Sequence, residues 1–159
     1  MKTVLLVCHA NTCRSIMAHV LLEKLLAERN GRAAVRVRSA GISPRARDGM
    51  IPSLDARIVL REDGIRLGEQ TLTSTALRHH PELLAEADLI LTMTTDQKAM
   101  LETFDTVRAP RFTLREFAGD PGDIADPVGQ GEEAYRACRD DIRRYLERGL
   151  DRLLVMWPA

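Results

Sequence analysis

One stretch decides how the chain is interpreted, and it runs Val7-Cys8-His9-Ala10-Asn11-Thr12-Cys13-Arg14-Ser15. An apolar run, Val4-Leu5-Leu6-Val7, leads into it, and a short continuous run of this kind is typical of a buried parallel strand. Behind it, apolar residues recur at the spacing of one helix face: Ala18, Leu21, Leu22, Leu25 and Leu26. The stretch is therefore predicted to be a tight turn between a strand and a helix.

The predicted turn carries the residue types of an anion cradle. Residues 9–13 are mostly small or polar, as a backbone that curls round a ligand requires, and several amides of such a turn point inward at the start of the helix. Arg14 offers a planar fork of donors that matches phosphate oxygens. Cys8 lies at the floor of the cradle, where the helix N-terminus and the cation favour a thiolate. A thiolate beneath a bound phosphate is an in-line nucleophile.

This Cys-x5-Arg turn, its place near the N-terminus and the run from Cys8 to Ser15 resemble the low-molecular-weight protein tyrosine phosphatase family. The resemblance covers nearly the whole chain and includes the protein arginine phosphatase branch. It implies a cysteine phosphatase that hydrolyses phosphorylated protein side chains through a cysteinyl-phosphate intermediate, with Cys8 and Arg14 as catalytic residues. It also implies that the rest of the loop binds the phosphate and the substrate: His9, Ala10, Asn11, Thr12, Cys13 and Ser15.

The leaving group requires a proton, and a Gly- and Pro-rich segment, residues 118–131, contains three candidate acids: Asp120, Asp123 and Asp126. The residues alone leave the choice open, because an Asp-Pro pair is also a common turn former. The general acid of the family is an Asp followed by Pro in this region, so the resemblance favours Asp126, which precedes Pro127. The same side chain, as a carboxylate, is then expected to activate the water of the second step.

Further residues are expected to support the loop. The Asn11 side chain suits a left-handed backbone conformation. The Ser15 hydroxyl is expected to donate to the Cys8 thiolate, to cap the helix, or to do both. In the family, a Ser in a Ser-Ala-Gly turn braces the loop Asn, which points to Ser39. Cys13 is either a small loop filler or the partner of Cys8 in a protective disulfide.

Strands alternating with helices predict an α/β fold with a doubly wound, four-stranded parallel sheet. Strands are expected at residues 3–7, 35–39 (near an edge), 88–93 and 107–114. Helices are expected at 15–30 with a stop at Gly31, at 53–63 with Leu54 and Ile58 on one face, at 81–87, at 94–104 from a Thr94–Gln97 capping box, and at 132–156 with Cys138 on an apolar stripe. Residues 65–80 give no clear pattern. Ligands bind beyond the carboxyl ends of such strands, where Cys8, Ser39 and Thr94 are expected.

The composition fits one globular domain of 159 residues, with 45% hydrophobic residues and a formal net charge of +0. This charge balance predicts neither nucleic-acid binding nor a membrane partner. No apolar run is long enough for a membrane span, and no signal peptide is expected. Three cysteines, an odd number, favour a reducing cytoplasm over a disulfide framework. The four histidines lack the spacing of metal ligands, so we expect no metal and no cofactor. The expected partners are phosphorylated proteins, and the expected assembly is a monomer or weak homodimer.

Two departures from the family pattern favour reduced activity, or an inactive phosphate-binding module as an alternative function. The family loop usually reads Cys-x-Gly-Asn-x-Cys-Arg-Ser-Pro, whereas this chain has Ala10 for the Gly and Ile16 for the Pro. If the Gly position needs a positive φ, Ala10 costs about 1 kcal/mol. Another alternative is arsenate reductase, which in a related family adds a shuttling cysteine pair to this loop. No such pair lies near residues 75–95 of this chain.

The residue before Cys13 indicates the substrate. Tyrosine-directed members of the family usually carry an aliphatic residue there, and the arginine-directed branch carries Thr, so Thr12 favours phosphoarginine. A hydroxyl at the pocket wall also suits a polar guanidinium better than a phenol ring. Val128 and Gly129 follow the Asp-Pro pair, where tyrosine-directed members have aromatic residues and the arginine branch usually has Phe. Phosphotyrosine is the second substrate hypothesis.

Overall fold

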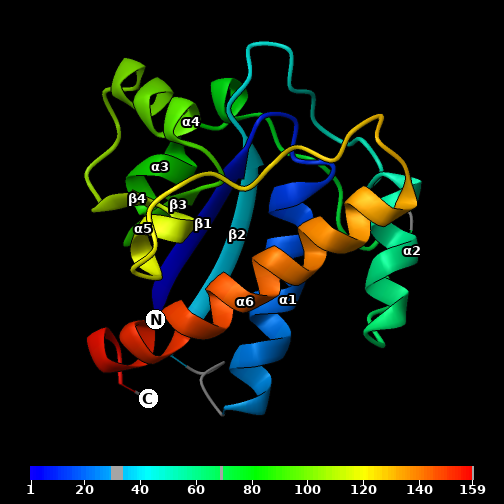
Figure 1. Ribbon diagram of the computed structural model, residues 1–159. Helices are drawn as coiled ribbons and strands as arrows, with labels where there is room; N and C mark the ends of the chain where they lie inside the picture. The colour runs from blue at the N-terminus through cyan, green and yellow to red at the C-terminus, as the bar shows by residue number, and fades with distance from the viewer. Residues whose placement is uncertain (30–33, 69, 159) are drawn as a thin grey trace.

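The computed structural model describes residues 1–29, 34–68 and 70–158, and its strands and helices alternate as predicted (Figure 1). In chain order the elements are β1 (Lys2–Cys8), α1 (Arg14–Glu28), β2 (Val35–Gly41), α2 (Leu54–Glu62), the 3-10 helix η1 (Leu77–His79), α3 (Glu82–Glu86), β3 (Leu89–Thr92), α4 (Thr95–Met100), the 3-10 helix η2 (Leu101–Thr103), β4 (Arg111–Thr113), α5 (Leu114–Phe117) and α6 (Glu132–Met156).

The four strands form one parallel sheet in the order β2-β1-β3-β4, which confirms the predicted doubly wound α/β fold. β1 lies inside the sheet because residues 4–7 are apolar without interruption, and all four are 0% exposed. β2 lies at an edge, as its alternating pattern predicts. The carboxyl ends of β1 and β2 meet in register, with Cys8 opposite Gly41. This edge of the sheet carries the candidate site.

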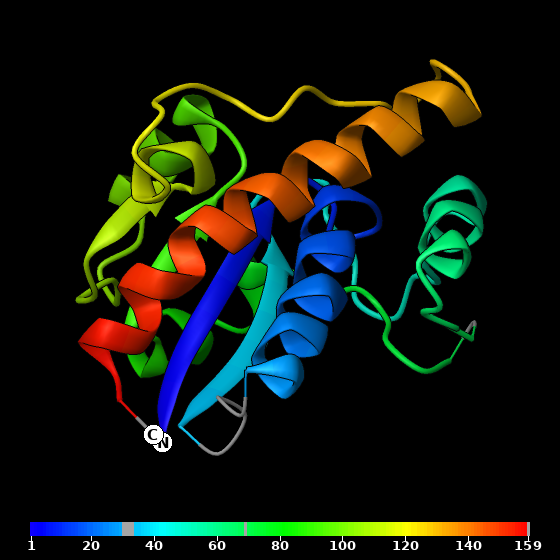
Figure 2. The ribbon, with the colours of Figure 1, turned by 60° about the horizontal axis from the view of Figure 1, so that its bottom comes forward.

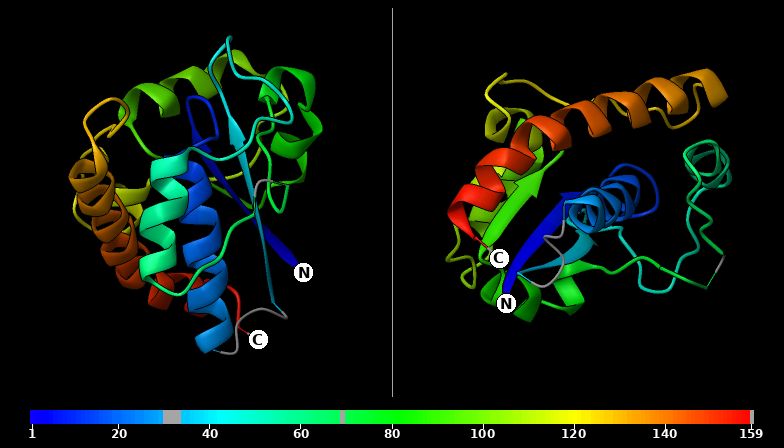
Figure 3. Two further views of the ribbon diagram at one scale, coloured as in Figure 1. Left: turned by 90° about the vertical axis from the view of Figure 1, so that its right-hand side faces the viewer. Right: turned by 90° about the horizontal axis from the view of Figure 1, so that it is seen from below.

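Helices cover both faces of the sheet (Figures 2 and 3). The long helix α6 crosses over α1 on one face, and α3 and η2 pack on the other. Alternate residues of β1 divide between the two core layers, because successive side chains of a strand point to opposite faces. Val4, Leu6 and Cys8 pack on the side of α1 and α6, and Leu5 and Val7 on the other side. Cys8 therefore ends the central strand on the side from which α1 begins.

The strand predicted at residues 107–114 is shorter than expected. β4 begins at Arg111, directly after Pro110, which cannot donate a ladder hydrogen bond. It ends because Thr113 and Glu116 form a capping box that starts the short helix α5, an element that the sequence pattern did not predict. The capping box of Thr94 with Gln97, which was predicted, is confirmed at the start of α4.

Two of the predicted helices differ in detail. Leu54 and Ile58 share a face of α2, but this is not its buried face, because Leu54 is 61% exposed and the helix packs mainly on α6 through other residues. The buried residues of α2 are Ala56, Val59 and Leu60. Helix α1 runs from Arg14 to Glu28 and so ends before residue 30, where its end was expected, and the predicted stop at Gly31 lies outside the described residues. The apolar stripe predicted for α6 is confirmed, with Cys138 buried on it.

Candidate active site

A tight loop of residues 8–15 joins β1 to α1, and we refer to it as the Cys8 loop. Its left-handed residue is Asn11, with a φ of 61°, as predicted from the tolerance of Asn for this conformation. The Asn11 amide donates to Cys8 Sγ over 3.3 Å, and Ser15 Oγ lies 2.9 Å from the same sulfur. Cys8 is only 3% exposed. The sulfur therefore lies at the floor of the loop, surrounded by donors.

A short chain of side-chain hydrogen bonds leads to this sulfur. Asn11 Nδ2 donates to Ser15 Oγ over 2.8 Å, and the Ser15 hydroxyl can in turn donate to Cys8 Sγ when the sulfur is a thiolate, which has no proton to give. Ser15 does not cap the helix, because α1 begins at Arg14 and Cys13 occupies the N-cap position. Of the two roles considered for Ser15, the structure supports the one that serves the sulfur.

The Cys8 loop is bonded to three other segments, through its backbone and through the Asn11 side chain. Amides donate to its carbonyls from the end of β2 and the start of α2 over 2.9 to 3.0 Å: Ile42 N to Cys8 O, Ser43 N to His9 O and Ser53 N to Thr12 O. From a third segment, Thr75 N donates to Asn11 Oδ1 over 2.9 Å. Thr75 is a supporting residue that sequence reasoning missed. Its contact uses a backbone amide in a segment without regular periodicity, so no side-chain pattern could reveal it.

Gly41 allows the Cys8 loop to approach the end of β2. A Cβ atom at this position would lie 2.6 Å from His9 O and 2.9 Å from Ala10 C, which are both backbone atoms. The loop would have to move to accept any side chain here. A Gly within a strand often marks a close backbone approach, so the Ser-Ala-Gly sequence was the available signal for this residue.

Ser39 lies beside the Cys8 loop, but it does not brace Asn11 as the family resemblance implied. Its hydroxyl is 2.7 Å from Nδ1 of His19 on α1, whereas the Asn11 side chain bonds Ser15 and the Thr75 amide. Burial lowers the pKa of His19 to about 4, so its ring is neutral near pH 7. Ser39 and the neutral His19 therefore join the end of β2 to α1 behind the loop.

Arg14 connects the Cys8 loop with residues 118–131, which we refer to as the Asp126 loop. Its Nη1 donates to Ile124 O over 2.9 Å, and its Nη2 lies 3.7 Å from Asp126 Oδ2. The Arg14 side chain is 5% exposed and that of Asp126 is 51% exposed. The structure thus brings together the cation and the carboxylate that the sequence placed in distant segments, at the end of the sheet where Cys8 lies.

The two other candidate acids are engaged elsewhere. Asp123 Oδ1 accepts from the amide and the hydroxyl of Thr95, over 2.8 and 2.9 Å, which ties the loop to the start of α4. Asp120 Oδ2 accepts from the Tyr145 hydroxyl over 2.9 Å and from Arg115 over 3.1 Å, and these contacts hold the pKa of Asp120 below its usual range. Of these three aspartates, Asp126 is the one that pairs with Arg14.

Residues 3–154 of the chain match the protein family described as low molecular weight phosphotyrosine protein phosphatase. The chain belongs to this family. Among its relatives, the protein-arginine-phosphatase of Geobacillus stearothermophilus is 38% identical over 152 residues, which cover 94% of this chain and 95% of that protein.

Several solved structures resemble this low-molecular-weight phosphatase over nearly its full length. The low molecular weight protein tyrosine phosphatase from T. tengcongensis has a TM-score of 0.84 and 29% identity, and the match covers 96% of this chain and 99% of that one. A Cys-to-Ser mutant of the YwlE arginine phosphatase has a TM-score of 0.82 and 33% identity, covering 96% and 95% of the two chains. In that mutant the active-site serine is phosphorylated.

The two departures of this phosphatase from the family loop are tolerated by the fold. Ala10 carries no cost from a positive φ, because Asn11 is the one non-Gly residue with positive φ among the described residues. Ile16 is fully buried within α1. His9 and Ala10 are exposed at the mouth of the loop and Thr12 is half-buried, so all three can be reached from solvent.

The cysteines of the phosphatase are all free and buried. Burial raises the pKa of Cys13 far above its usual range and that of Cys138 to about 12, so both are neutral thiols near pH 7. The disulfide between Cys8 and Cys13 stays a prediction. Across the described ranges, no cluster of three or more His, Cys, Asp or Glu could hold a metal ion. In the same residues, no helix has the length and apolar character needed to span a membrane.

Proposed function

We propose that this phosphatase hydrolyses phosphorylated arginine side chains of proteins through a covalent phosphate on Cys8. One arrangement carries the proposal: the buried Cys8 sulfur, held by donors of its own loop, lies at the same end of the sheet as the Arg14–Asp126 pair. Donors held in this way stabilise a thiolate, and the guanidinium attracts a phosphate dianion. The phosphorylated active-site serine of the YwlE mutant supports the same chemistry.

In the first step, the Cys8 thiolate attacks phosphorus and forms an S–P bond while the bond from phosphorus to the leaving nitrogen breaks. Asp126, as the acid, gives its proton to that nitrogen. Arg14 and the amides of the Cys8 loop hold the oxygens of the transferring phosphoryl group, where negative charge shifts as the transition state forms. The half-exposed side chain of Asp126 can be reached by the leaving group and by the water of the second step.

In the second step, a water molecule attacks phosphorus and the S–P bond breaks. Its proton passes to the Asp126 carboxylate, which now acts as the base. Cys8 leaves as a thiolate, and the Ser15 hydroxyl stabilises the sulfur by donating to it, because a thiolate can only accept a hydrogen bond. Inorganic phosphate is released, and the enzyme returns to its starting state.

Thr12 is the residue proposed to select the guanidinium. The Ser53 amide fixes its carbonyl over 2.9 Å, and its side chain is half-buried in the loop wall. A hydroxyl accepts hydrogen bonds from a guanidinium, whereas an aliphatic group would favour a phenol ring. Val128 and Gly129 follow Asp126-Pro127, so no aromatic side chain at these positions can stack on a phenol. The identity of 38% with a protein-arginine-phosphatase supports the same substrate.

Turnover of matched peptides carrying phosphoarginine or phosphotyrosine tests the proposal. We expect wild type to prefer phosphoarginine in kcat/KM, and Thr12→Ile to lower this value by about tenfold, the cost of a hydrogen bond to a charged group. Thr12→Ser, which keeps the hydroxyl, is the matched control and should retain the preference. The likeness to the T. tengcongensis enzyme makes phosphotyrosine the second candidate substrate. If wild type prefers phosphotyrosine, the arginine assignment is overturned but the phosphatase activity is not. If neither peptide releases phosphate, the proposal that the chain is an active phosphatase is overturned.

We further propose that the chain acts in the cytoplasm as a single catalytic domain and as a monomer or weak homodimer. Three buried, free thiols support a reducing compartment. The match to one family over residues 3–154 supports a single domain. Cell fractionation checks the cytoplasmic location, and light scattering at micromolar concentration checks the oligomeric state. A stable higher oligomer would contradict the proposed monomer or weak homodimer.

A further inference from the structure

Helix α2 lies near the Cys8 loop but is not supported by the sheet. In the tilted view and in the view from below, it lies beyond α1 and away from the strands (Figures 2 and 3). Its main packing partner is α6. The position of α2 relative to the active site therefore depends on its contacts with α6.

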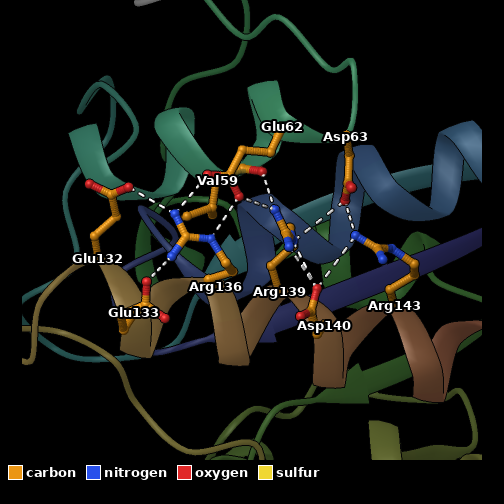
Figure 4. Close-up of polar contacts among 9 residues, drawn as sticks. All are labelled: Val59, Glu62, Asp63, Glu132, Glu133, Arg136, Arg139, Asp140 and Arg143. Carbon is orange, nitrogen blue, oxygen red and sulfur yellow. Dashed lines mark hydrogen bonds and ion pairs between the residues drawn. The ribbon is translucent and has the colours of Figure 1, made fainter.

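Three arginines of α6 hold the C-terminal half of α2, as Figure 4 shows: Arg136, Arg139 and Arg143. The central one is Arg139, whose Nη1 donates to Val59 O and to Glu62 Oε1, both over 2.7 Å. It is 6% exposed. Val59 O belongs to the last turn of α2, where carbonyls lack partners within the helix and positive charge is favourable. Arg139 thus stabilises the end of α2 and attaches it to α6.

The other end of α2 is bonded to the Cys8 loop. Ser53 caps the helix by accepting from Ala56 N over 3.2 Å, and its own amide donates to Thr12 O over 2.9 Å. Tyr135, in the first turn of α6, is buried, and it lies close enough to Ser53 and Cys13 for both to affect its pKa. Helix α6 therefore contacts α2 at both ends. The contact at the N-terminal end includes Thr12, the residue proposed to select the substrate.

The start of α2 presents apolar side chains to solvent beside the loop. Met50, Ile51 and Leu54 are 46%, 40% and 61% exposed, and they flank Ser53 in the sequence. A small phosphate ester fills only the cradle above Cys8. A phosphorylated protein must also cover the surface around the cradle, and this apolar surface is part of it.

We propose that Arg139 is a positioning residue for protein substrates. By attaching α2 to α6, it holds the start of α2 at a fixed distance from the Cys8 loop, so that a protein can contact this surface while its phosphate lies in the cradle. The proposal rests on the phosphatase activity proposed above and assigns a function to α2 that only large substrates use. Arg139 acts through α2 and does not touch the reacting atoms.

Kinetics of Arg139→Met with a large and a small substrate test this role. Met keeps much of the apolar stem and removes the guanidinium. The matched control is Arg144→Met, because Arg144 is on the same helix, has a 57% exposed side chain and pairs with Asp141 of α6 itself. For an arginine-phosphorylated protein, we expect KM to rise by about tenfold in Arg139→Met, since uniform binding is lost, and kcat to stay within about twofold. For p-nitrophenyl phosphate, both constants should stay within about twofold of wild type.

An equal loss of kcat/KM for the phosphorylated protein and for p-nitrophenyl phosphate would overturn the proposal. An unchanged KM for the protein in a folded Arg139→Met variant would also overturn it. If thermal melts show that Arg139→Met does not fold, Glu62→Ala replaces it, and an unchanged KM for the protein in that variant would overturn the proposal. Failure of the arginine assignment is distinguishable, because it appears in the wild type. KM of Arg139→Met and of wild type is then compared for a phosphotyrosyl protein, since the expected rise in KM depends on the size of the substrate and not on its phosphorylated group.

Discussion

The Cys8 loop carries the proposed nucleophile and the Asp126 loop carries the proposed acid, and the two loops are built differently. In the Cys8 loop the sulfur is almost fully buried and receives bonds from its own loop, while other segments bond the loop backbone. The Asp126 loop is held at separate points by Met93, just after β3, by α4 and by Arg14, and the Asp126 side chain is 51% exposed. The Cys8 sulfur is thus buried within its loop, whereas the Asp126 side chain is exposed on a loop that is bonded at a few points.

This difference agrees with what each loop has to do. A nucleophile gains and loses charge in place, and fixed donors stabilise that charge without having to reorganise. A residue that serves as acid and then as base must exchange protons with water, for which exposure is useful. Substitutions in the Cys8 loop should therefore affect both activity and stability, and those in the Asp126 loop mainly activity.

Cys8→Ser, in the Cys8 loop, should have the largest effect. We expect kcat for p-nitrophenyl phosphate to fall by at least about 10⁴-fold, because the hydroxyl is a far weaker nucleophile than a thiolate. The cradle remains, so calorimetry should still detect phosphate binding. Turnover at the wild-type rate would show that the sulfur is not the nucleophile.

Asp126→Asn tests the Asp126 loop. We expect kcat to fall by roughly 10² to 10³-fold, the usual contribution of a general acid, with little change in the free energy of unfolding. Asp123→Asn is the matched control, because Asn still accepts hydrogen bonds from Thr95 and should cost far less. Full activity in Asp126→Asn together with a large loss in Asp123→Asn would move the acid role to Asp123.

His19, behind the Cys8 loop, predicts a pH dependence of stability. Burial lowers its pKa from 6.5 to about 4 on folding, so acid favours the unfolded state, which binds the proton first. The stability that the neutral ring provides is complete above pH 6.5 and is lost as pH falls toward about 4, by about 3 kcal/mol in total. His19→Gln should flatten this part of the curve in urea unfolding measured at several pH values. Parallel curves for the two proteins would contradict the assignment.

Gly41→Ala should have the smallest effect of the four, although backbone atoms of the Cys8 loop must move to accept the new side chain. We expect the new methyl group, which would lie 2.6 Å from His9 O, to destabilise the fold by about 1 to 2 kcal/mol and to lower kcat as the Cys8 loop moves. Gly68→Ala is the control, since a Cβ there meets only the Thr71 hydroxyl at 2.9 Å, the end of a flexible side chain. Equal unfolding midpoints in the two variants would count against this close approach.

The predictable features were those carried by consecutive residues. The buried run before Cys8, the helical spacing after it and the capping box at Thr94 are local patterns, and β1, α1 and α4 follow from them. The capping box of Thr113 with Glu116 is equally local, but it lies at the end of a segment whose pattern predicts a strand. The outward orientation of Leu54 could not be predicted, because the spacing of Leu54 and Ile58 does not reveal which neighbour α2 packs against.

From the sequence alone follow the parallel α/β fold, the turn that holds the sulfur and the arginine, and the set of aspartates that contains the proposed acid, because strands, helices and tight turns depend on residues close together along the chain. Only the tertiary structure decided which aspartate pairs with Arg14, that the Thr75 amide and not Ser39 bonds Asn11, and that α6 holds α2 through Arg139. These contacts join segments that are distant in the chain. They depend on how the sheet and its helices pack, and no local pattern records them.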